Sequence, residues 1–411
     1  MNRWIRLCAA VIAMIMIANL QYAWTLFVKP MIAVTHWKLS DVQWGFTLFI
    51  AFETWAMPCS GWLVDKLGPR LFVSMAGVLC GVGWGALGRA HSLGALYGFY
   101  SLAGLGAALV YCGSVGVGLK WFPDKRGLAA GMISAGFGSG AALFIPVIAH
   151  VIRVEDYRAA FLYTGIVQGL LIICAAQFLV NPPHREIARL PATTRVTVRS
   201  HGHEFTSAEM LRTPHFYLLF AMALMMGIGG LMVTAQVAPM ADTLKVGGAA
   251  LTLSLTLNPL ANGAARIFWG WVSDLIGRER TMFVAFLLQS VFLLSVTTVA
   301  PGSATAFITT VALVFFTWGE VYSLFPSVCT DFFGARHAVS NYSFIYSAKG
   351  AASIAGGGLA ALLFEKTGSW NYGFYVCAAL ALITAFASLG LRKMPLPVKH
   401  AQPANAVTVG R

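Results

Sequence analysis

Long apolar runs recur through nearly the whole chain and restrict its fold more than any other feature of the sequence. Of the 411 residues, 58% are hydrophobic and only 10% are charged. Soluble globular proteins average about 45–50% apolar and about 25% charged residues. An α-helix needs roughly 20 mostly apolar residues to cross a bilayer. The composition therefore predicts an all-α membrane protein with many spans, and a large soluble helical protein does not fit it.

Short charged loops, or loops with Gly and Pro, separate the apolar runs and predict twelve transmembrane helices. The predicted spans cover residues 5–28, 42–64, 71–89, 93–119, 128–152, 158–180, 215–241, 248–273, 281–300, 304–329, 337–363 and 370–391. The first run continues past Asn19 without a small-residue cleavage pattern. It is therefore interpreted as a transmembrane helix and not as a cleaved signal peptide.

One long polar and basic connection divides the predicted spans into six and six. It indicates an N-terminal bundle at 1–180, a central loop at 181–214, a C-terminal bundle at 215–391 and a tail at 392–411. If both termini are cytoplasmic, cytoplasmic segments hold 19 of the 28 Lys and Arg residues and outer loops hold 7. This excess fits the positive-inside rule. The net charge of +13 therefore reflects topology, and no basic surface for nucleic acid is predicted.

A loop motif occurs once in each half. GWLVDKLGPR (61–70) and GWVSDLIGRER (270–280) share Gly, Trp, Asp and Gly at an offset of 209 residues. Matching loops in two halves indicate a parallel repeat about an axis along the membrane normal, and thus two pseudo-symmetric six-helix bundles. Simple anchoring of the topology by basic loops is the alternative interpretation.

The motif resembles the signature of the major facilitator superfamily. The resemblance implies a transporter that works by alternating access, with charged motif residues that help to close the cytoplasmic side. In this chain the motif residues are Asp65, Lys66, Arg70, Asp274 and Arg278.

Four ionisable residues lie near the middle of predicted spans: Glu53, Arg266, Glu320 and Lys349. A charge at the centre of a membrane helix costs roughly 2.5–3.5 kcal/mol on insertion scales, so these side chains are expected to face the protein interior. Three interpretations are open. Arg266 and Lys349 form an anion site, or the glutamates neutralise them in structural ion pairs, or the glutamates carry protons.

Polar and aromatic residues lie at a similar depth. Tyr and Trp offer an apolar body with one donor, which suits the lining of a small wet cavity, although helix packing or an interfacial belt would use the same residues. The candidates are Gln21, Tyr22, Tyr111, Trp318, Tyr322 and Tyr346.

Five segments resemble the bacterial oxalate:formate antiporters of this superfamily. They are QYAWTL (21–26), KWFPDKRGLAAG (120–131), EMLRTPHF (209–216), FFTWGEVYSLFPS (315–327) and NYSFIYSAKGAASIAGGG (341–358). The resemblance implies oxalate:formate-type anion exchange, with Arg266 and Lys349 binding the anion. It also implies a cavity lined by Gln21, Tyr22, Tyr111, Trp318 and Tyr322.

The chain departs from the family's oxalate exchanger at Glu320, Tyr346 and Phe137, which stand for glycine, tryptophan and tyrosine. An ionised Glu320 near Lys349 would offset one positive charge and favour a monocarboxylate. A protonated Glu320 would couple transport to a proton. Proton-coupled monocarboxylate symport is therefore the alternative function, with Glu320 or Glu53 as the proton carrier or balancing charge, and a non-transporting carboxylate sensor is a third.

No catalytic, cofactor or metal site is predicted. The chain has no Walker-type loop, no ligand cluster within the spans and no C-x-x-C pair among its seven cysteines. We therefore expect a monomeric, multi-pass protein of the bacterial cytoplasmic membrane that is not an enzyme. Its expected partners are small carboxylate anions, such as oxalate or formate, and the lipid bilayer.

Overall fold

The structure is a computed structural model that describes residues 2–122, 126–182, 204–301, 303–334 and 337–397. Within these ranges, the side chains of residues 61, 62, 64–66, 126–128 and 339 are not described. All regular elements in the described ranges are helical, as the composition predicts.

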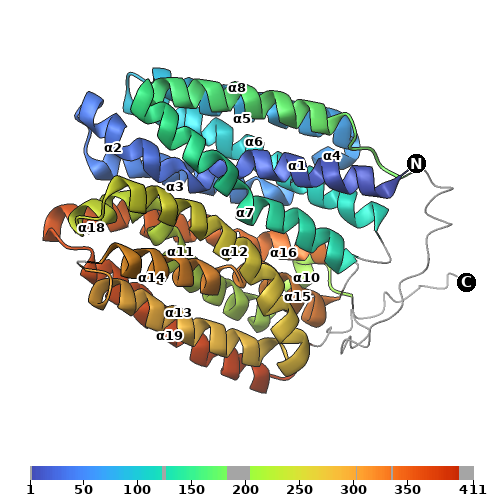
Figure 1. The fold of residues 1–411 in the computed structure, drawn as a ribbon. Helices are drawn as coiled ribbons and strands as arrows, with labels where there is room; N and C mark the ends of the chain where they lie inside the picture. The colour runs from blue at the N-terminus through green and yellow to red at the C-terminus, as the bar shows by residue number, and fades with distance from the viewer. Residues whose placement is uncertain (1, 123–125, 183–203, 302, 335–336, 398–411) are drawn as a thin grey trace, which may run out of the picture.

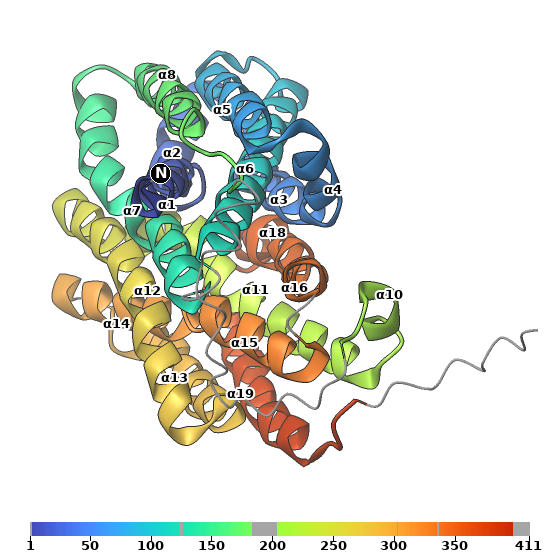
Figure 2. The ribbon, with the colours of Figure 1, turned by 90° about the vertical axis from the view of Figure 1, so that its right-hand side faces the viewer.

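Helices of the first half of the chain lie together on one side of the molecule, and those of the second half lie on the other (Figures 1 and 2). The first half contains α1 (Arg3–Tyr22), α2 (Trp24–Thr35), α3 (Leu39–Trp55), α4 (Met57–Leu67), α5 (Pro69–Ala86), the 3₁₀ turn η1 (Leu87–Arg89), α6 (Leu93–Trp121), α7 (Arg126–Val154) and α8 (Tyr157–Ala176). The second half contains α10 (Ser207–Met210), α11 (Pro214–Thr243), α12 (Gly248–Ile276), α13 (Arg278–Thr298), α14 (Ala304–Trp318), α15 (Val321–Phe333), α16 (Ala338–Tyr346), α17 (Ala348–Ile354), the π-helical turn η2 (Ala355–Leu359), α18 (Ala360–Thr367) and α19 (Asn371–Lys393).

Apart from the short α10, these described elements form twelve rods that run side by side (Figure 1). Ten of the described helical stretches are long and apolar enough to cross a membrane. The rod of α3 and α4 and the rod of α12 are not among the ten, and these two rods carry Glu53 and Arg266. The twelve-helix architecture expected from the sequence is confirmed.

Polar residues in the loops start several rods. Ser92, Asp156, Thr213 and Ser303 each accept a hydrogen bond from a backbone N–H in the first turn of the helix that follows. These contacts satisfy N–H groups that have no partner within the helix. The short loops thus fix where each membrane-crossing rod begins.

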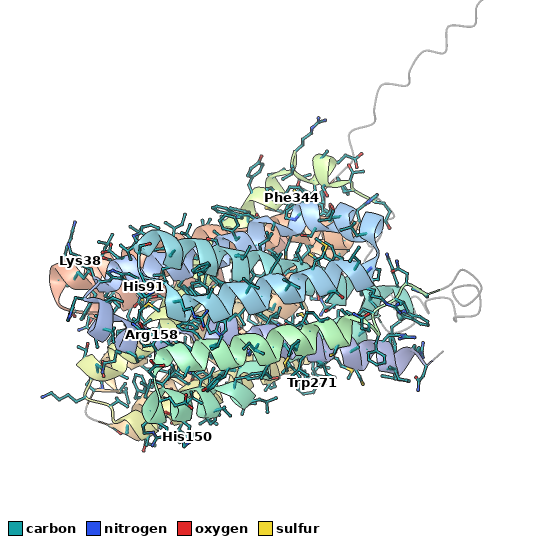
Figure 3. The ribbon with its side chains drawn as sticks, turned by 90° about the horizontal axis from the view of Figure 1, so that it is seen from above. Lys38, His91, His150, Arg158, Trp271 and Phe344 are labelled. Atoms are coloured by element: carbon teal, nitrogen blue, oxygen red, sulfur yellow. The ribbon has the colours of Figure 1, made fainter. Side chains whose placement is uncertain are left out.

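The long sides of the molecule are apolar, and the ends are polar. Large hydrophobic side chains are exposed along the rods, and Trp271, for example, is 60% exposed on the side of α12 (Figure 3). Lys38, His91, His150 and Arg158 lie toward the end of the molecule at which α2 lies (Figure 3). We call this the α2 end, and the opposite end, where α1 begins and α19 ends, the α1 end (Figure 1). An apolar belt between polar ends matches a protein that crosses a bilayer many times.

Four rods are interrupted, although the sequence predicted continuous spans at 5–28, 42–64, 304–329 and 337–363. The interruptions lie at Ala23, Ala56, Gly319–Glu320 and Ser347. Pro58 follows the second of them, and a proline has no N–H with which to continue the hydrogen-bond ladder. Exposed backbone groups are excluded from lipid, so interruptions at membrane depth are tolerated only where protein or a cavity covers them.

At the fourth interruption, Ser347 makes one side-chain contact within its own rod and accepts one hydrogen bond from the other half of the chain. Its hydroxyl donates to the carbonyl oxygen of Phe344 at 2.6 Å, which competes with the regular ladder. The indole N–H of Trp55, from the other half, donates to the Ser347 carbonyl oxygen at 3.1 Å. The break between α16 and α17 is therefore stabilised by a contact from Trp55 at the end of α3.

Candidate functional site

The interrupted rods carry most of the residues predicted for the site. Gln21 and Tyr22 end α1, Trp318 ends α14, and Tyr346 ends α16. Lys349 lies in the first turn of α17, just beyond the break at Ser347. Irregular backbone near the middle of membrane helices is typical of binding sites in secondary transporters.

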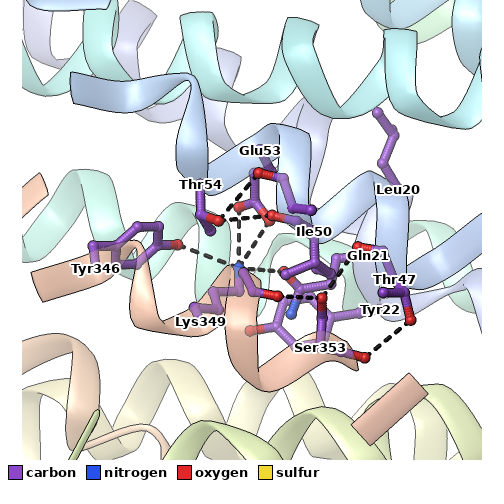
Figure 4. Close-up of polar contacts among 12 residues, drawn as sticks. Leu20, Gln21, Tyr22, Thr47, Ile50, Glu53, Thr54, Tyr346, Lys349 and Ser353 are labelled. Carbon is purple, nitrogen blue, oxygen red and sulfur yellow. Dashed lines mark hydrogen bonds and ion pairs between the residues drawn. The ribbon is translucent and has the colours of Figure 1, made fainter. Parts of the chain in front are cut away.

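Lys349 is buried among partners from both halves of the chain (Figure 4). Its Nζ donates to Gln21 Oε1 at 2.7 Å and to Tyr346 Oη at 3.2 Å. It forms an ion pair with Glu53, at 2.9 Å to Oε2 and 3.1 Å to Oε1. Lys349 is 5% exposed and Glu53 is 0% exposed. One ammonium group thus links α17 to α1, through Gln21, and to α3, through Glu53.

Arg266 is buried too, at 4% exposure, but its partners are neutral. Its Nη1 donates to the carbonyl oxygen of Ser134 at 2.7 Å, and its Nη2 donates to Asn262 Oδ1 at 3.0 Å. The guanidinium carbon lies 4.5 Å from the centroid of the Tyr322 ring. No carboxylate of a described residue is within ion-pair distance of Arg266. A buried cation is thus held by a carbonyl, an amide and a ring face.

Tyr322 connects the two cations. Its ring centroid lies 4.5 Å from the Arg266 guanidinium and 5.9 Å from Lys349 Nζ. The electron-rich face of an aromatic ring attracts cations at such distances. Around it, Trp318 packs edge-on against Tyr322 at 5.5 Å between centroids, and Tyr346 stacks on Tyr111 at 5.7 Å.

All eight predicted binding residues gather around this centre. Tyr22, the remaining one, places its hydroxyl 3.5 Å from Asn262 Oδ1 and its ring 5.8 Å from that of Phe137. Phe137 lies under Lys349 Nζ at 5.4 Å. The packing around the cations is close: a cavity of about 20 Å³ remains beside Lys349, lined also by Trp318, Tyr322 and Tyr346. Such a space has room for about one water molecule.

Sequence reasoning missed Asn262 and Ser134 as partners of Arg266. Asn262 precedes Arg266 by four residues, and residues four apart lie on the same face of a helix. That spacing is a signal that would have found it. Ser134 contributes a backbone carbonyl from another rod, and no sequence pattern marks such a contact.

The sequence left open whether Glu320 or Glu53 neutralises the cations, and in the structure Glu53 is the residue that pairs with Lys349. Glu320 lies at the break between α14 and α15 and is 0% exposed. Neither of its carboxyl oxygens has a hydrogen-bond partner in the described part of the chain. Glu320 is therefore a buried carboxyl with no hydrogen-bond partner among the described residues, and it forms no ion pair with Arg266 or Lys349.

The two halves also meet between the site and the α2 end. Pro239 cannot donate to the carbonyl oxygen of Ala235, and Gln43 Nε2 donates to that oxygen at 2.8 Å instead. The same Nε2 contacts Gln236 Oε1 at 3.0 Å, and Gln236 donates to the carbonyl oxygen of Gly357 at 3.0 Å. The side-chain amides of Gln43 and Gln236 thus link α3, α11 and η2.

Further contacts join the halves on the same side of the site. Thr47 Oγ1 donates to the carbonyl oxygen of Ser353 at 2.9 Å. Ser40 donates to the Glu365 carboxylate through its backbone N–H at 2.8 Å and its hydroxyl at 2.9 Å. Between described residues, the hydrogen bonds that join the two halves lie at the level of the site or toward the α2 end. The structure is therefore closed at the α2 end.

The predicted gate residues lie near the α1 end, away from the cations. Arg278 contacts Asp274 at 2.7 Å and Asp331 at 3.5 Å, and all three belong to the second half. Arg70 is exposed at the start of α5. Asp65 and Lys66 belong to α4, but their side chains lie outside the described residues.

Comparison with known proteins gives matches over nearly the whole chain. The sequence model of the Major Facilitator Superfamily matches residues 8–352 and, in a second match, residues 217–408. An oxalate:formate antiporter from Oxalobacter formigenes is 40% identical over 97% of this chain and 94% of that protein. Apicoplast pyruvate carrier 1 from Toxoplasma gondii is 25% identical over 87% of this chain and 76% of that protein.

Human monocarboxylate transporter 11 is also 25% identical, over 86% of this chain and 76% of that protein. These relatives are transporters, in agreement with the expectation that the chain is not an enzyme. The long match to the family's sequence model and the 40% identity to a full-length relative carry the assignment. The chain belongs to the major facilitator superfamily of multi-pass membrane transporters.

Proposed function

We propose that the chain is a secondary active transporter that exchanges small carboxylate anions, as an oxalate:formate antiporter does. One observation carries the proposal: Arg266 is a buried cation in the middle of a membrane rod, and only neutral groups of the described chain contact it. Burial of a charge without a counter-ion is costly. A small carboxylate at Arg266 supplies the missing negative charge.

The neighbours of Arg266 suit such an anion. Tyr22 brings its hydroxyl group to the same region, and the Tyr322 ring faces the guanidinium. The aromatic rings of Tyr111, Trp318 and Tyr346 exclude bulk water. Lys349 and Gln21 extend the site toward the second rod. Electrostatic contacts are strong where water is excluded. The relatives named for oxalate and formate, for pyruvate and for monocarboxylates all carry small carboxylates by name.

The proposed cycle moves the bundle at 1–180 against the bundle at 215–391, linked by the loop at 181–214, with a tail at 392–411. The contacts toward the α2 end hold the outer side closed, and the charged motifs with Asp65, Lys66, Arg70, Asp274 and Arg278 close the cytoplasmic side in the other state. We place the protein, as a monomer, in the bacterial cytoplasmic membrane with both termini in the cytoplasm, as the Lys and Arg distribution indicates.

Counterflow into liposomes tests the function directly. Purified protein is reconstituted into liposomes loaded with unlabelled formate, and uptake of labelled formate and labelled oxalate is measured. We expect uptake that requires an internal carboxylate and persists without a pH gradient. Absence of exchange with formate, oxalate, acetate and pyruvate would overturn the proposal, and a non-transporting sensor that binds carboxylates would then account for the site.

Closure at the α2 end predicts the effect of enlarging Gly357. A Cβ atom on this residue would collide with Thr47 Oγ1, so Gly357→Val is expected to hinder closure and to slow exchange about tenfold, since overpacking costs about 1–3 kcal/mol. Gly390→Val is the matched control, because Gly390 has open space around it. Initial rates of formate counterflow measure both variants. Equal rates for the two would show that this contact does not limit the cycle.

Glu320 supports a second candidate, proton-coupled monocarboxylate symport. Neither carboxyl oxygen of Glu320 has a partner among the described residues, and an ionised carboxylate is costly to bury in such a place, so this side chain is suited to carry a proton. Symport requires Glu320 to release this proton during the cycle. Exchange does not.

Glu320→Gln separates the two modes, since glutamine resembles the protonated carboxyl. If exchange is correct, the variant retains most of its formate counterflow, and its uptake does not respond to an imposed pH gradient. If symport is correct, wild-type uptake is driven by an inward proton gradient and Glu320→Gln loses that drive. Glu155→Gln, at an exposed glutamate, is the control.

A further inference from the structure

The two cations of the site differ in one respect that the sequence could not reveal. Lys349 already has a counter-ion, Glu53, at 2.9 Å. Arg266 has none among the described residues, and its partners are the Ser134 carbonyl, the Asn262 amide and the Tyr322 ring. Only one of the two positive charges is therefore open to a substrate.

The donors of Lys349 are also in use. A lysine ammonium has three N–H groups. Its partners Gln21, Glu53 and Tyr346 lie at 2.7, 2.9 and 3.2 Å from Nζ. A second carboxylate can reach the ammonium only if one of these partners leaves.

We propose that Glu53 sets the charge of the substrate and makes this transporter selective for monocarboxylates over dicarboxylates. Arg266, Lys349 and Glu53 together carry a formal charge of +1. A monocarboxylate brings this sum to zero, whereas a dianion such as oxalate leaves one buried negative charge without a partner. Uncompensated buried charges are strongly unfavourable. The proposal rests on the proposed carboxylate exchange and names the substrate class of that same site.

Glu53, and not Glu320, therefore fills the place of a second substrate carboxylate. A dicarboxylate bound at Arg266 would need a second cation for its other carboxylate, and Lys349 is the candidate. The Glu53 carboxylate already pairs with Lys349. Glu53→Gln removes the negative charge but keeps an acceptor oxygen for the ammonium. The variant site carries a formal charge of +2, which matches a dianion.

Competition in counterflow tests the proposal. Labelled formate is exchanged in liposomes, and the concentrations of unlabelled oxalate and of unlabelled acetate that halve its uptake are measured. For the wild type, we expect oxalate to compete at least about tenfold more weakly than acetate, a factor equivalent to about 1.4 kcal/mol. Glu53→Gln is expected to shift the ratio toward oxalate by about tenfold or more. Glu53→Asp, which keeps the charge, and the exposed control Glu155→Gln are expected to keep a preference for acetate.

The outcomes separate this proposal from the proposed function. If the wild type exchanges no carboxylate, the proposed function fails. If the wild type exchanges carboxylates but oxalate competes as well as acetate, or Glu53→Gln leaves the ratio unchanged, the role of Glu53 is overturned and exchange stands. If Glu53→Gln is inactive in exchange, quenching of tryptophan fluorescence by oxalate and by acetate gives the same ratio at equilibrium, since Trp318 packs on Tyr322 within the site.

Discussion

Replacement of Arg266 by alanine is expected to abolish carboxylate exchange. The guanidinium is the buried cation without a counter-ion in the described chain, so its removal leaves the substrate anion unpaired in a site that excludes water. We expect a loss of about 100-fold or more, because truncation of one partner of a buried charge pair costs about 2–5 kcal/mol. Counterflow of labelled formate into liposomes with matched protein content measures the effect.

Two further variants make this result specific. Arg392→Ala removes the same charge from an exposed position in the last turn of α19 and is expected to exchange normally. Arg266→Lys keeps the charge but loses the planar fork that reaches Ser134 and Asn262 together, so we expect partial activity at most. Normal exchange by Arg266→Ala would contradict the assigned anion site.

Removal of Lys349 alone is expected to destabilise the protein strongly. Lys349→Met leaves Glu53 as a buried carboxylate without its cation, and such single removals cost about 3–5 kcal/mol. The double variant Glu53→Gln/Lys349→Met carries no charge at this place and should recover most of the lost stability. The apparent melting temperature of the purified protein in detergent measures the series.

The control for this series is Lys366→Met, at an exposed lysine of α18, which is expected to melt like the wild type. Non-additivity is the sign of a real pair: the effect of both substitutions together should be smaller than the effect of Lys349→Met alone. A double variant less stable than Lys349→Met would show that the ion pair does not govern stability here.

The architecture could be read from the sequence because its causes are local. Apolar runs of membrane length predict rods, and a charge such as Arg266 or Lys349 within a run predicts an interior position. The same logic located Glu53 and Glu320 at similar depth, but depth does not define which residues face each other. The pairing of Lys349 with Glu53 instead of Glu320 depends on the rotation of each rod about its axis and on how the rods pack.

The pattern of apolar residues did not predict the interruptions of the rods either. The breaks at Ala23 and Ser347 lie in sequences that read as continuous apolar spans, and partners from other rods stabilise them, such as Trp55 at Ser347. Asn262 was within reach by helical spacing from Arg266, whereas Ser134 was not, because it acts through its backbone. The role of Asp65 and Lys66 in closing the cytoplasmic side stays a prediction, because their side chains lie outside the described residues.

The proline in α11 has a consequence for the opening of the transporter. The Ala235 carbonyl has no helical donor, because Pro239 lacks the N–H that would bond to it. The contact of this oxygen with Gln43 can therefore break without unwinding any helix. Water entering the gap would take the place of Gln43 at that oxygen, and a hydrogen bond exchanged for one with water changes the free energy by only about 1 kcal/mol. This contact at the α2 end can therefore be exchanged for a contact with water at little cost in free energy, so it does not by itself oppose opening.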